Sequence, residues 1–404
     1  MLDISVEAAL ERILAGCSPC EAIEIPAEDA AGQVLAEDVL APHALPPFTN
    51  SGMDGFAVRV ADLATASQTQ PVALPAIGMS QAGGAPAPAV VPGTTVRVMT
   101  GAPLPEGAEA VVPIENVEEA ANNHVRFFEP TKRGRHVRPA GEDVAAGQPA
   151  IPAGKLARPA EVGLLAALGI ERVKVVRRPR IAIVSTGDEL LRPGEPLAPG
   201  RIRDANGPAL AAFVTEQGAV PLPLGIARDT HDELRAKIDA AREAKADLII
   251  TSAGASAGDF DIVRGLLAEE DALDVWRVNI KPGRPLLYGR VGGIPLIGLP
   301  GNPAAALIVA ELVVRPAIER MRGLPPLHRH TVQATLDAPQ RGSERRHYIR
   351  ALVQWQDGSY RAITRGIGAG SGALTTLVRS NALLVIPEDT TELPTGSLVE
   401  AILL

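Results

Sequence analysis

The sequence predicts a multidomain protein that combines a central doubly wound α/β domain with separate β domains. Between residues 178 and 324, apolar segments of strand length alternate with helical patterns. Such alternation is typical of a parallel sheet with right-handed crossovers. Elsewhere, short β segments are separated by turns, in keeping with the 39 Gly and 36 Pro in the 404 residues. A chain of this length is expected to hold roughly two to four domains.

Four units are expected in chain order. Residues 1–45 and 140–177 predict a mixed connector or dimerisation domain, which begins with an amphipathic helix, and residues 46–139 an inserted β domain. Residues 178–324 predict the α/β domain. Residues 325–404 predict a C-terminal β-barrel-like domain, with a hairpin turn at Asp357-Gly358.

The strands and helices of the α/β domain follow from its apolar periodicity. Strands are expected at residues 180–185, 220–224, 247–251, 275–280 and 294–299. Helices are expected at residues 207–216, 232–243, 261–268 and 303–321. All five strands are predicted to run parallel, so that ligands collect at their carboxyl ends.

Composition and charge exclude several classes of protein. The net charge of −8 argues against a general nucleic-acid binder, which would neutralise phosphates with basic residues. The two cysteines, Cys17 and Cys20, are interpreted as incidental reduced thiols, since two thiols cannot complete a four-ligand zinc site. No signal-peptide pattern and no apolar run of membrane-spanning length occurs. We therefore expect a soluble cytoplasmic protein that contacts neither nucleic acid nor membrane.

The stretch from Trp276 to Pro303 has the pattern of an anion-binding site. Arg277, Lys281 and Arg284 lie within eight positions, on a strand and the turn that follows it. Another strand then leads into Gly301-Asn302-Pro303 and an alanine-rich helix. A capped helix N-terminus directs backbone N–H groups and the positive end of the helix dipole at a docked anion. For Arg277 alone, an ordinary surface arginine is the favoured interpretation.

Further small-residue loops and carboxylates extend this site. STGDEL follows the first expected strand and TSAGASAG the third, and the latter can wrap a phosphate with backbone N–H groups. Carboxylates spread over several loops suit Mg²⁺, which takes a few carboxylates together with waters and substrate phosphates. No Ser-His-Asp order, HExxH or Walker lysine is present. The residues alone therefore indicate an α/β enzyme that acts on a phosphorylated or oxyanionic ligand with the help of a metal.

Six motifs in order resemble a known family. PPFTNSGMDGFAV, MTGAPLPEGAEAVV, STGDEL, TSAGASAGDFD, IKPGRP and GLPGNP are similar to those of the MoeA-type molybdopterin molybdenumtransferases, which include the E domain of gephyrin. The resemblance extends over nearly the whole chain.

The resemblance implies a reaction, a cofactor and partners. The family inserts molybdenum from molybdate into adenylylated molybdopterin and releases AMP, with Mg²⁺ present. It implies an elongated four-domain subunit and a homodimer, whose site lies between the α/β domain of one subunit and the β domain of the other. Transient contacts with the molybdopterin adenylyltransferase and with apo-molybdoenzymes are also implied.

The resemblance assigns roles to residues by motif position. The expected catalytic residues are Asp54, Thr100, Asp143 and Glu189, and the expected metal ligands are Glu189, Asp261 and Asp54. The residues expected to bind substrate or molybdate are Arg277, Lys281, Arg284, Arg350, Ser371, Ser256, Gly301 and Asn302. Charge-assisted hydrogen bonds to oxyanions are strong, so Lys281 and Arg350 are expected to hold molybdate.

Three positions depart from the family pattern. Arg277 stands where lysine is usual, Ala253 where glycine is usual, and Ala305 where a hydroxyl residue is usual. These departures leave the choice between molybdate and tungstate open. Two other functions remain alternatives: a non-catalytic scaffold like the gephyrin E domain, and adenylyl transfer to molybdopterin. Retention of Asp54, Thr100, Glu189 and Lys281 favours the molybdenum-inserting enzyme over the scaffold. The 177 residues before the α/β domain and the Asp54 loop argue against adenylyl transfer.

Overall fold

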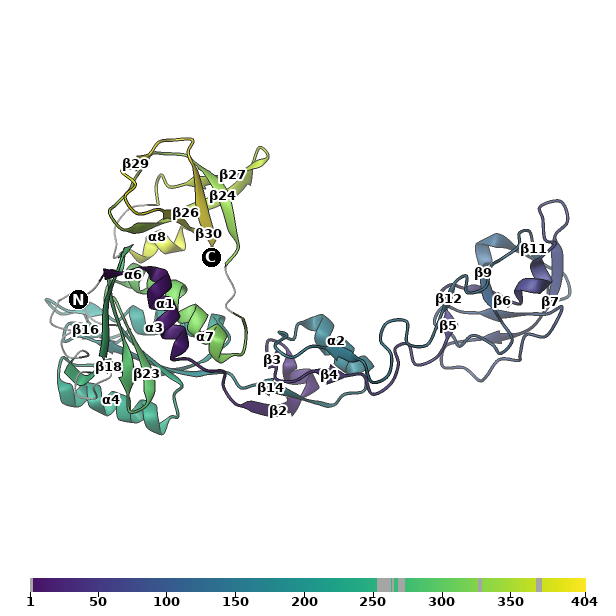
Figure 1. Cartoon of the computed structure of the whole chain (residues 1–404), viewed down its shortest axis with the longest axis horizontal. Coiled ribbons are helices and arrows are strands. Elements are labelled where there is room, and N and C mark those ends of the chain that lie inside the picture. Colours follow the sequence, from purple (N-terminus) through teal and green to yellow (C-terminus); the bar gives the residue numbers. More distant parts are fainter. Residues whose placement is uncertain (1–2, 253–262, 264, 268–272, 326–328, 368–372) are drawn as a thin grey trace.

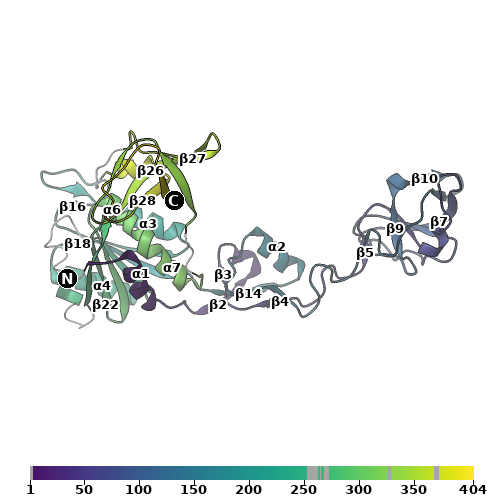
Figure 2. The same cartoon turned by 45° about the horizontal axis from the view of Figure 1, so that its top comes forward.

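The chain is elongated and built from several separate sheets. The structure, a computed structural model, describes residues 3–252, 263, 265–267, 273–325, 329–367 and 373–404. The α/β domain and the C-terminal β domain lie at one end, a small connector follows, and a second β domain lies at the far end (Figures 1 and 2). The predicted fold class, a central α/β domain combined with β domains, is confirmed.

The α/β domain is built on a seven-stranded sheet in the order β1-β20-β22-β23-β19-β15-β18. Its strands are β1 (Asp3–Ile4), β15 (Arg180–Thr186), β18 (Val220–Ala227), β19 (Leu248–Ser252), β20 (Leu273–Val278), β22 (Pro285–Val291) and β23 (Ile294–Leu299). Its helices are α1 (Val6–Ala15), α3 (Asn206–Glu216), α4 (His231–Glu243), α6 (Pro303–Val309) and α7 (Arg315–Met321). A short parallel pair, β16 (Leu190–Leu191) and β17 (Ile202–Arg203), projects from it.

The five predicted strands do run in one direction, but the sheet contains an additional antiparallel strand, β22, which the sequence analysis did not predict. This strand pairs antiparallel with both β20 and β23, whereas β20, β23, β19, β15 and β18 share one direction. The turn between β22 and β23 consists of Gly292 and Gly293, with φ of 57° and 81°. Positive φ at both central residues is typical of a type I′ hairpin. The Gly-Gly pair between two apolar runs is therefore the sequence signal for this hairpin.

Both faces of the sheet are covered by buried aliphatic side chains. On one face, α1, α3, α6 and α7 contribute Ile13, Leu210, Ile308 and Ile318 to a single cluster. On the other face, α4 contributes Leu234 and Ile238 to a second cluster. Since parallel sheets must be covered on both faces, these helices complete the α/β layering.

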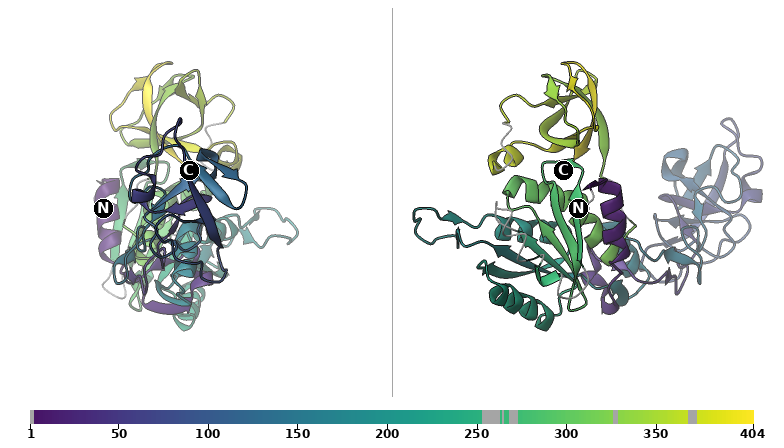
Figure 3. Two further views of the ribbon diagram at one scale, coloured as in Figure 1. Left: turned by 90° about the vertical axis from the view of Figure 1, so that its right-hand side faces the viewer. Right: turned by 60° about the vertical axis from the view of Figure 1, so that its left-hand side comes forward.

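The helix α1 packs on the α/β domain, as Figure 3 shows. Its first turn is capped by Ser5, whose Oγ accepts from the Ala8 N–H at 3.1 Å. Its buried residues Val6, Ala9 and Ile13 join the same cluster as Ile181 and Ile297 of the sheet. The preceding strand β1 extends the sheet beside β20.

The connector is a small unit made from two separate parts of the chain. Strands β2 (Ala22–Pro26), β14 (Arg172–Val176) and β3 (Val34–Leu35) form one sheet, and β4 (Val39–Leu40) pairs with β13 (Pro149–Ile151). Helix α2 (Pro159–Ala167) and the 3₁₀ turn η1 (Ala27–Ala30) cover it. The exact boundaries proposed for the four domains stay predictions.

One arginine joins the connector to the α/β domain. Arg177 donates to Glu21 Oε1 at 2.7 Å and to both Asp247 oxygens at 2.9 Å. Asp247 Oδ2 also accepts from the Arg180 N–H at 2.7 Å, at the start of β15. These bonds raise the pKa of Arg177. Bidentate carboxylate bonding of this kind gives geometric specificity, so it fixes the angle at which the connector leaves the sheet.

The distal β domain contains a six-stranded sheet in the order β10-β11-β7-β8-β6-β9. Its strands are β6 (Gly55–Val58), β7 (Val72–Ser80), β8 (Thr95–Val98), β9 (Ala110–Pro113), β10 (Val117–Ala120) and β11 (His124–Phe127). Short strands β5 (Asn50–Ser51) and β12 (Val137–Arg138) pair at its base, and η2 (Val60–Leu63) and η3 (Ile114–Asn116) are 3₁₀ turns. Phe56 and Phe127 pack edge to face at its centre, 6.4 Å between ring centroids.

The C-terminal domain is a closed barrel. Strands β26 (Arg346–Gln356), β27 (Ser359–Ile363), β24 (Thr331–Leu336), β30 (Leu398–Leu403) and β28 (Ala382–Ile386) pair in sequence, and β28 returns to β26. The predicted hairpin at Asp357-Gly358 is confirmed, with φ of 49° and 78°. The remaining elements are β21 (Ile280–Lys281), β25 (Gln340–Arg341), β29 (Glu392–Leu393) and α8 (Leu374–Val378).

The expected helix at residues 303–321 contains a π-helical turn, η4 (Ala310–Val314). Next to it, Arg315 is 8% exposed and donates to Glu311 at 2.6 Å and to Glu319 at 2.7 Å. Arg329, which leads into the barrel, donates to both Glu311 oxygens at 2.7 and 3.0 Å. The buried Glu311 carboxylate therefore joins the α/β domain to the first barrel segment.

We predict that Glu311→Leu destabilises the protein by about 3–5 kcal/mol, because buried Arg315 and half-buried Arg329 both lose a carboxylate partner. The measurement is the free energy of unfolding by urea for the full chain. Asp239→Asn is the matched control: it removes the carboxylate of an exposed pair with Arg242, 3.8 Å apart, which is expected to matter by only about 0–1 kcal/mol. Equal effects of the two variants would contradict a structural role for Glu311.

Candidate functional site

Polar side chains gather where the parallel strands β15, β19 and β23 end. Ser185, Thr186 and Ser252 are buried there, and Thr186 Oγ1 donates to the Ser252 carbonyl at 3.2 Å. Thr251 Oγ1 is buried and has no hydrogen-bond partner among the described residues. Unsatisfied buried hydroxyls are costly, so this edge of the sheet has hydrogen-bonding capacity left for a ligand.

The loop after β15 carries Glu189, whose carboxylate lies close to the backbone of Gly187. A Cβ added to Gly187 would lie 2.4 Å from Glu189 Oε2, so the half-buried carboxylate occupies the space that only glycine leaves open. Neighbouring Asp188 and Asp229 hold the loop, since the Asp188 N–H donates to Asp229 Oδ2 at 3.1 Å. Glu189 is therefore placed at the carboxyl edge of the sheet, as predicted for a ligand-binding loop.

The loop after β23 is tied to the start of α3. Asn206 Nδ2 donates to the Gly301 carbonyl at 2.8 Å, and the Gly207 N–H donates to Asp204 Oδ1 at 3.0 Å. Asn302 has extended φ and ψ of −64° and 117°, and its carbonyl accepts from the Ala306 N–H at 2.8 Å. Gly301 and Asn302 thus lie at the first turn of α6, as the sequence predicts.

The turn with Lys281 and Arg284 connects the sheet to the barrel. Lys281 is exposed and pairs with His347 in the parallel register of β21 and β26. A Cβ added to Gly283, whose φ is +99°, would lie 2.4 Å from Val309 Cγ2 and 3.6 Å from Pro300. The close packing of this glycine places the Lys281 turn directly against the Gly301 loop.

The barrel adds a buried cation to this region. Arg350 is 7% exposed, and its Nε and one terminal nitrogen are buried without a hydrogen-bond partner among the described residues. Burial lowers its pKa. Because a buried, unpaired guanidinium is costly, an anionic ligand that reaches Arg350 would gain a strong charge-assisted bond.

His347 shows that positive charge accumulates here. Burial and, to a smaller extent, the charges of Lys281, Arg350 and Arg345 together lower its pKa to about 4. Its Nδ1 is buried and has no partner in the described part of the chain. The sequence analysis missed His347 and Arg345; the signal is the run Arg345-Arg346-His347, three positions before Arg350.

The other half of the predicted site lies in the distal β domain. The Thr100 backbone N–H and hydroxyl both donate to Asp54 Oδ1 at 2.6 Å. These bonds, led by the Thr100 hydroxyl, lower the pKa of Asp54. Ser51 joins the two loops, since its carbonyl accepts from the Gly101 N–H at 2.8 Å and its hydroxyl donates to the Met53 carbonyl at 2.6 Å. Asp54 is thus an exposed, ionised carboxylate in a fixed position.

The structure does not bring all predicted residues together in one chain. Asp54, between β5 and β6, and Thr100, after β8, belong to the distal β domain, which lies at the far end of the molecule from the α/β domain and the barrel (Figure 1). Glu189, Lys281 and Arg350 belong to the α/β domain and the barrel. Asp143 is exposed in the segment between the connector and the β domain, where its N–H donates to the Leu45 carbonyl at 3.0 Å. The remaining predicted residues, Ser256, Asp261 and Ser371, lie outside the described residues.

Two of the departures from the family pattern can be located. Arg277 is exposed at the end of β20, beside Pro285 of β22. Ala305 is 2% exposed in the first turn of α6, so this position faces the protein interior. Ala253 lies outside the described residues.

Metal-binding groups are sparse in the described ranges. They contain no group of three or more His, Cys, Asp or Glu placed to hold a metal ion. Burial raises the pKa of Cys17 to about 11 and that of Cys20 to about 12, which makes both thiols poor nucleophiles and metal ligands. In the described part of the chain, no helix is long and apolar enough to cross a membrane.

Lys281, from the turn after β20, lies close to His347 and Arg350 of the barrel. The Gly301 loop lies beside this turn. This arrangement defines a multidomain protein with a basic region beside the carboxyl edge of an α/β sheet, the edge at which such folds collect their ligands. Residues 4–169 match the "MoeA N-terminal region (domain I and II)", residues 182–320 the "Probable molybdopterin binding domain", and residues 333–404 the "MoeA C-terminal region (domain IV)". The chain belongs to the MoeA family of molybdopterin molybdenumtransferases, which are transferases of molybdenum cofactor biosynthesis.

Individual relatives agree over almost the whole chain. Molybdopterin molybdenumtransferase 2 of Mycobacterium tuberculosis (strain H37Rv) is 39% identical over 94% of each protein. The molybdopterin molybdenumtransferase of Bacillus subtilis is 35% identical over 99% of this chain and 94% of the relative. A crystal structure of the molybdopterin biosynthesis MoeA protein of Pyrococcus horikoshii superposes with a TM-score of 0.85, at 28% identity over the full length of both chains.

We predict that His347 makes the stability depend on pH. Its pKa is lowered from 6.5 to about 4, so the unfolded chain takes up a proton at a higher pH than the folded chain does. The stabilisation is therefore complete above about pH 6.5 and is lost as the pH falls toward 4. His347→Asn is expected to flatten the free energy of unfolding between these pH values. The control is His43→Asn, an exposed histidine of the connector; an unchanged slope in His347→Asn would contradict the prediction.

Proposed function

We propose that this chain inserts molybdenum from molybdate into adenylylated molybdopterin and releases AMP. Family membership supports the reaction class. The observation that carries the proposal is the buried guanidinium of Arg350, next to Lys281 and His347, two of whose nitrogens lack a partner among the described residues. Molybdate is a tetrahedral dianion, and a desolvated guanidinium close to an exposed ammonium is well suited to hold it.

The chemistry requires a water molecule and two sulfur atoms. Water attacks phosphorus of the phosphoanhydride, AMP leaves, and the molybdopterin phosphate remains. The two thiol groups of the dithiolene bind molybdenum through sulfur and give up their protons, and one oxygen of molybdate takes up both protons and leaves as water. In this scheme Asp54, which Thr100 keeps ionised, orients the attacking water. Lys281 and Arg350 hold molybdate near the dithiolene.

Mg²⁺ is proposed as an ion that arrives with the substrate phosphates. Mg²⁺ commonly binds through one or two carboxylates together with substrate phosphates and water. Glu189, half-buried above Gly187 at the sheet edge, fits such a ligand, and Asp54 and Asp261 remain proposed ligands from the sequence. The bound ion would neutralise charge on the phosphoanhydride oxygens.

A homodimer would bring the two halves of the site together. Asp54 and Lys281 lie at opposite ends of one subunit (Figure 1), so a catalytic centre that uses both requires the β domain of a second copy. We further propose that the protein acts in the cytoplasm, where its free thiols Cys17 and Cys20 stay reduced. Transient contacts with the molybdopterin adenylyltransferase and with apo-molybdoenzymes would deliver substrate and collect product.

We predict that Asp54→Asn lowers the rate of AMP release about 100-fold or more, because the amide cannot act as a base toward water. The measurement is anaerobic: adenylylated molybdopterin, Mg²⁺ and molybdate are supplied, and AMP and active cofactor are followed together. Glu118→Gln, a change at an exposed carboxylate bonded to Arg126 in the same β domain, is the control. A wild-type rate in Asp54→Asn would remove Asp54 from the mechanism, and binding without AMP release by the wild type would refute the function.

We predict that two inactive variants restore activity when mixed. In a dimer assembled from Asp54→Asn and Lys281→Ala subunits, one of the two sites contains only wild-type residues. Random assembly therefore gives about a quarter of wild-type activity. Lys281→Ala mixed with Arg350→Met is the control, since both changes affect the same half of the site and no intact site can form. Absence of restoration in the first mixture would contradict a site shared between subunits.

A further inference from the structure

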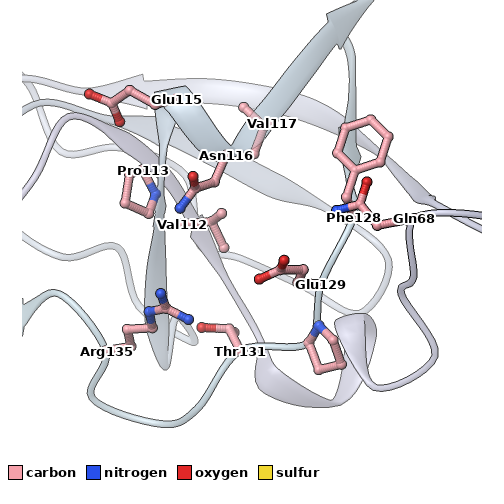
Figure 4. Close-up of a pocket in the computed structure, with 11 residues that line it drawn as sticks. Gln68, Val112, Pro113, Glu115, Asn116, Val117, Phe128, Glu129, Thr131 and Arg135 are labelled. Carbon is pink, nitrogen blue, oxygen red and sulfur yellow. The ribbon is translucent and has the colours of Figure 1, made fainter.

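A polar cavity in the distal β domain lies outside the residues considered so far. It has a volume of about 240 Å³ and lies between β9, η3 and the segment from Phe128 to Arg135 (Figure 4). Val112, Pro113 and Phe128 provide apolar walls. Drug-sized ligands occupy larger pockets of roughly 300–1,000 Å³, so this cavity suits a compact group such as one bicyclic ring.

One buried hydroxyl of the cavity lacks a hydrogen-bond partner among the described residues, and two charged side chains lie near it. Thr131 is 7% exposed, and its hydroxyl is buried without a hydrogen-bond partner among the described residues. In Figure 4 this hydroxyl and the guanidinium of Arg135 point toward one another on the same side of the view, with the Glu129 carboxylate above them. In the described part of the chain, neither Glu129 nor Arg135 forms an ion pair. A buried hydroxyl in this state indicates that a ligand completes its hydrogen bonding.

The polar groups of the cavity match the edge of a pterin ring. A 2-amino-4-oxopteridine presents two adjacent N–H donors beside a carbonyl acceptor. A carboxylate accepts such a donor pair with both oxygens, and a guanidinium or hydroxyl donates to the carbonyl. Glu129 supplies the carboxylate, and Arg135 and Thr131 supply the donors. Phe128 offers an aromatic side chain for contact with the flat ring.

The cavity is linked to the Asp54 loop through the backbone. The Ile114 N–H donates to the Asp54 carbonyl at 3.0 Å, between the lining residues Pro113 and Glu115. On the other side, the His136 carbonyl accepts from the Gly52 N–H at 2.9 Å, next to the lining residue Arg135. A ring bound in the cavity would therefore lie near the loop that carries the proposed catalytic carboxylate.

We propose that this cavity binds the pterin ring of the substrate, with Glu129 accepting from its paired N–H groups and with Arg135 and Thr131 donating to its carbonyl. The identity of the ligand rests on the proposed function. The geometry adds that the distal β domain, besides presenting Asp54, recognises the heterocycle itself.

The test compares two fluorescent rings that differ at one group. The probes are 6-hydroxymethylpterin and 6-hydroxymethyllumazine, in which a carbonyl replaces the 2-amino group and would face the Glu129 carboxylate. The full-length protein is expected to bind the pterin at least tenfold more tightly, a difference of about 1.4 kcal/mol. Glu129→Gln is expected to remove most of this preference. Thr131→Val is expected to weaken binding of both rings while the fold stays intact by circular dichroism.

The controls separate this inference from the proposed reaction. Glu118→Gln, outside the cavity, is expected to bind both rings like the wild type. Absence of saturable pterin binding, equal affinity for both rings, or wild-type binding by Glu129→Gln would overturn the inference. Normal AMP release without pterin binding in the cavity would overturn the inference and leave the function standing. Selective pterin binding without AMP release by the wild type would leave the inference standing and overturn the proposed function.

Discussion

The buried guanidinium of Arg350 is the constraint on which the candidate site depends. A cation that is 7% exposed, with two nitrogens lacking partners among the described residues, costs free energy in the protein alone. Burial lowers the pKa of the neighbouring His347, and the charges of Lys281 and Arg350 act in the same direction, so its imidazole stays neutral. Barrel closure supplies the free energy that holds Arg350 in place, because the β26 strand that carries it pairs with β27, β28 and β21. An oxyanion would offset the cost of this burial.

The second constraint is distance within the subunit. The chain passes through the connector twice. Where the second passage enters the α/β domain, Arg177 donates to Glu21 and Asp247 and holds the connector to that domain. This arrangement keeps the Asp54 loop away from the sheet edge that carries Lys281 (Figure 2). The two halves of the proposed chemistry, a carboxylate for water and cations for molybdate, are therefore built on separate rigid units. The elongated shape follows from that separation.

The sequence could predict elements whose signals are local. Alternating strands and helices gave the α/β domain, and Asp357-Gly358 gave the barrel hairpin, because periodicity and turn chemistry act over a few residues. The antiparallel β22 was missed, since its Pro285 start resembles the end of a turn. His347 was missed because its altered pKa arises first from burial and then from the charge of Lys281, which pairs with it only after the barrel has docked on the sheet. Long-range packing of this kind leaves no periodic pattern in the sequence.

The position of Lys281 depends on both domains that meet at this edge. Ile280 and Lys281 follow the sheet strand β20, yet they pair with the barrel strand β26, and the Ile280 carbonyl accepts from Arg345 at 3.0 Å. Gly283, two residues on, packs against Val309 of α6, where a larger residue would collide. The Glu311 network holds the first barrel segment to the same helix region. A shift of the barrel would thus move Lys281 and Arg350 together, so the geometry of the anion site is set by the interface between the domains.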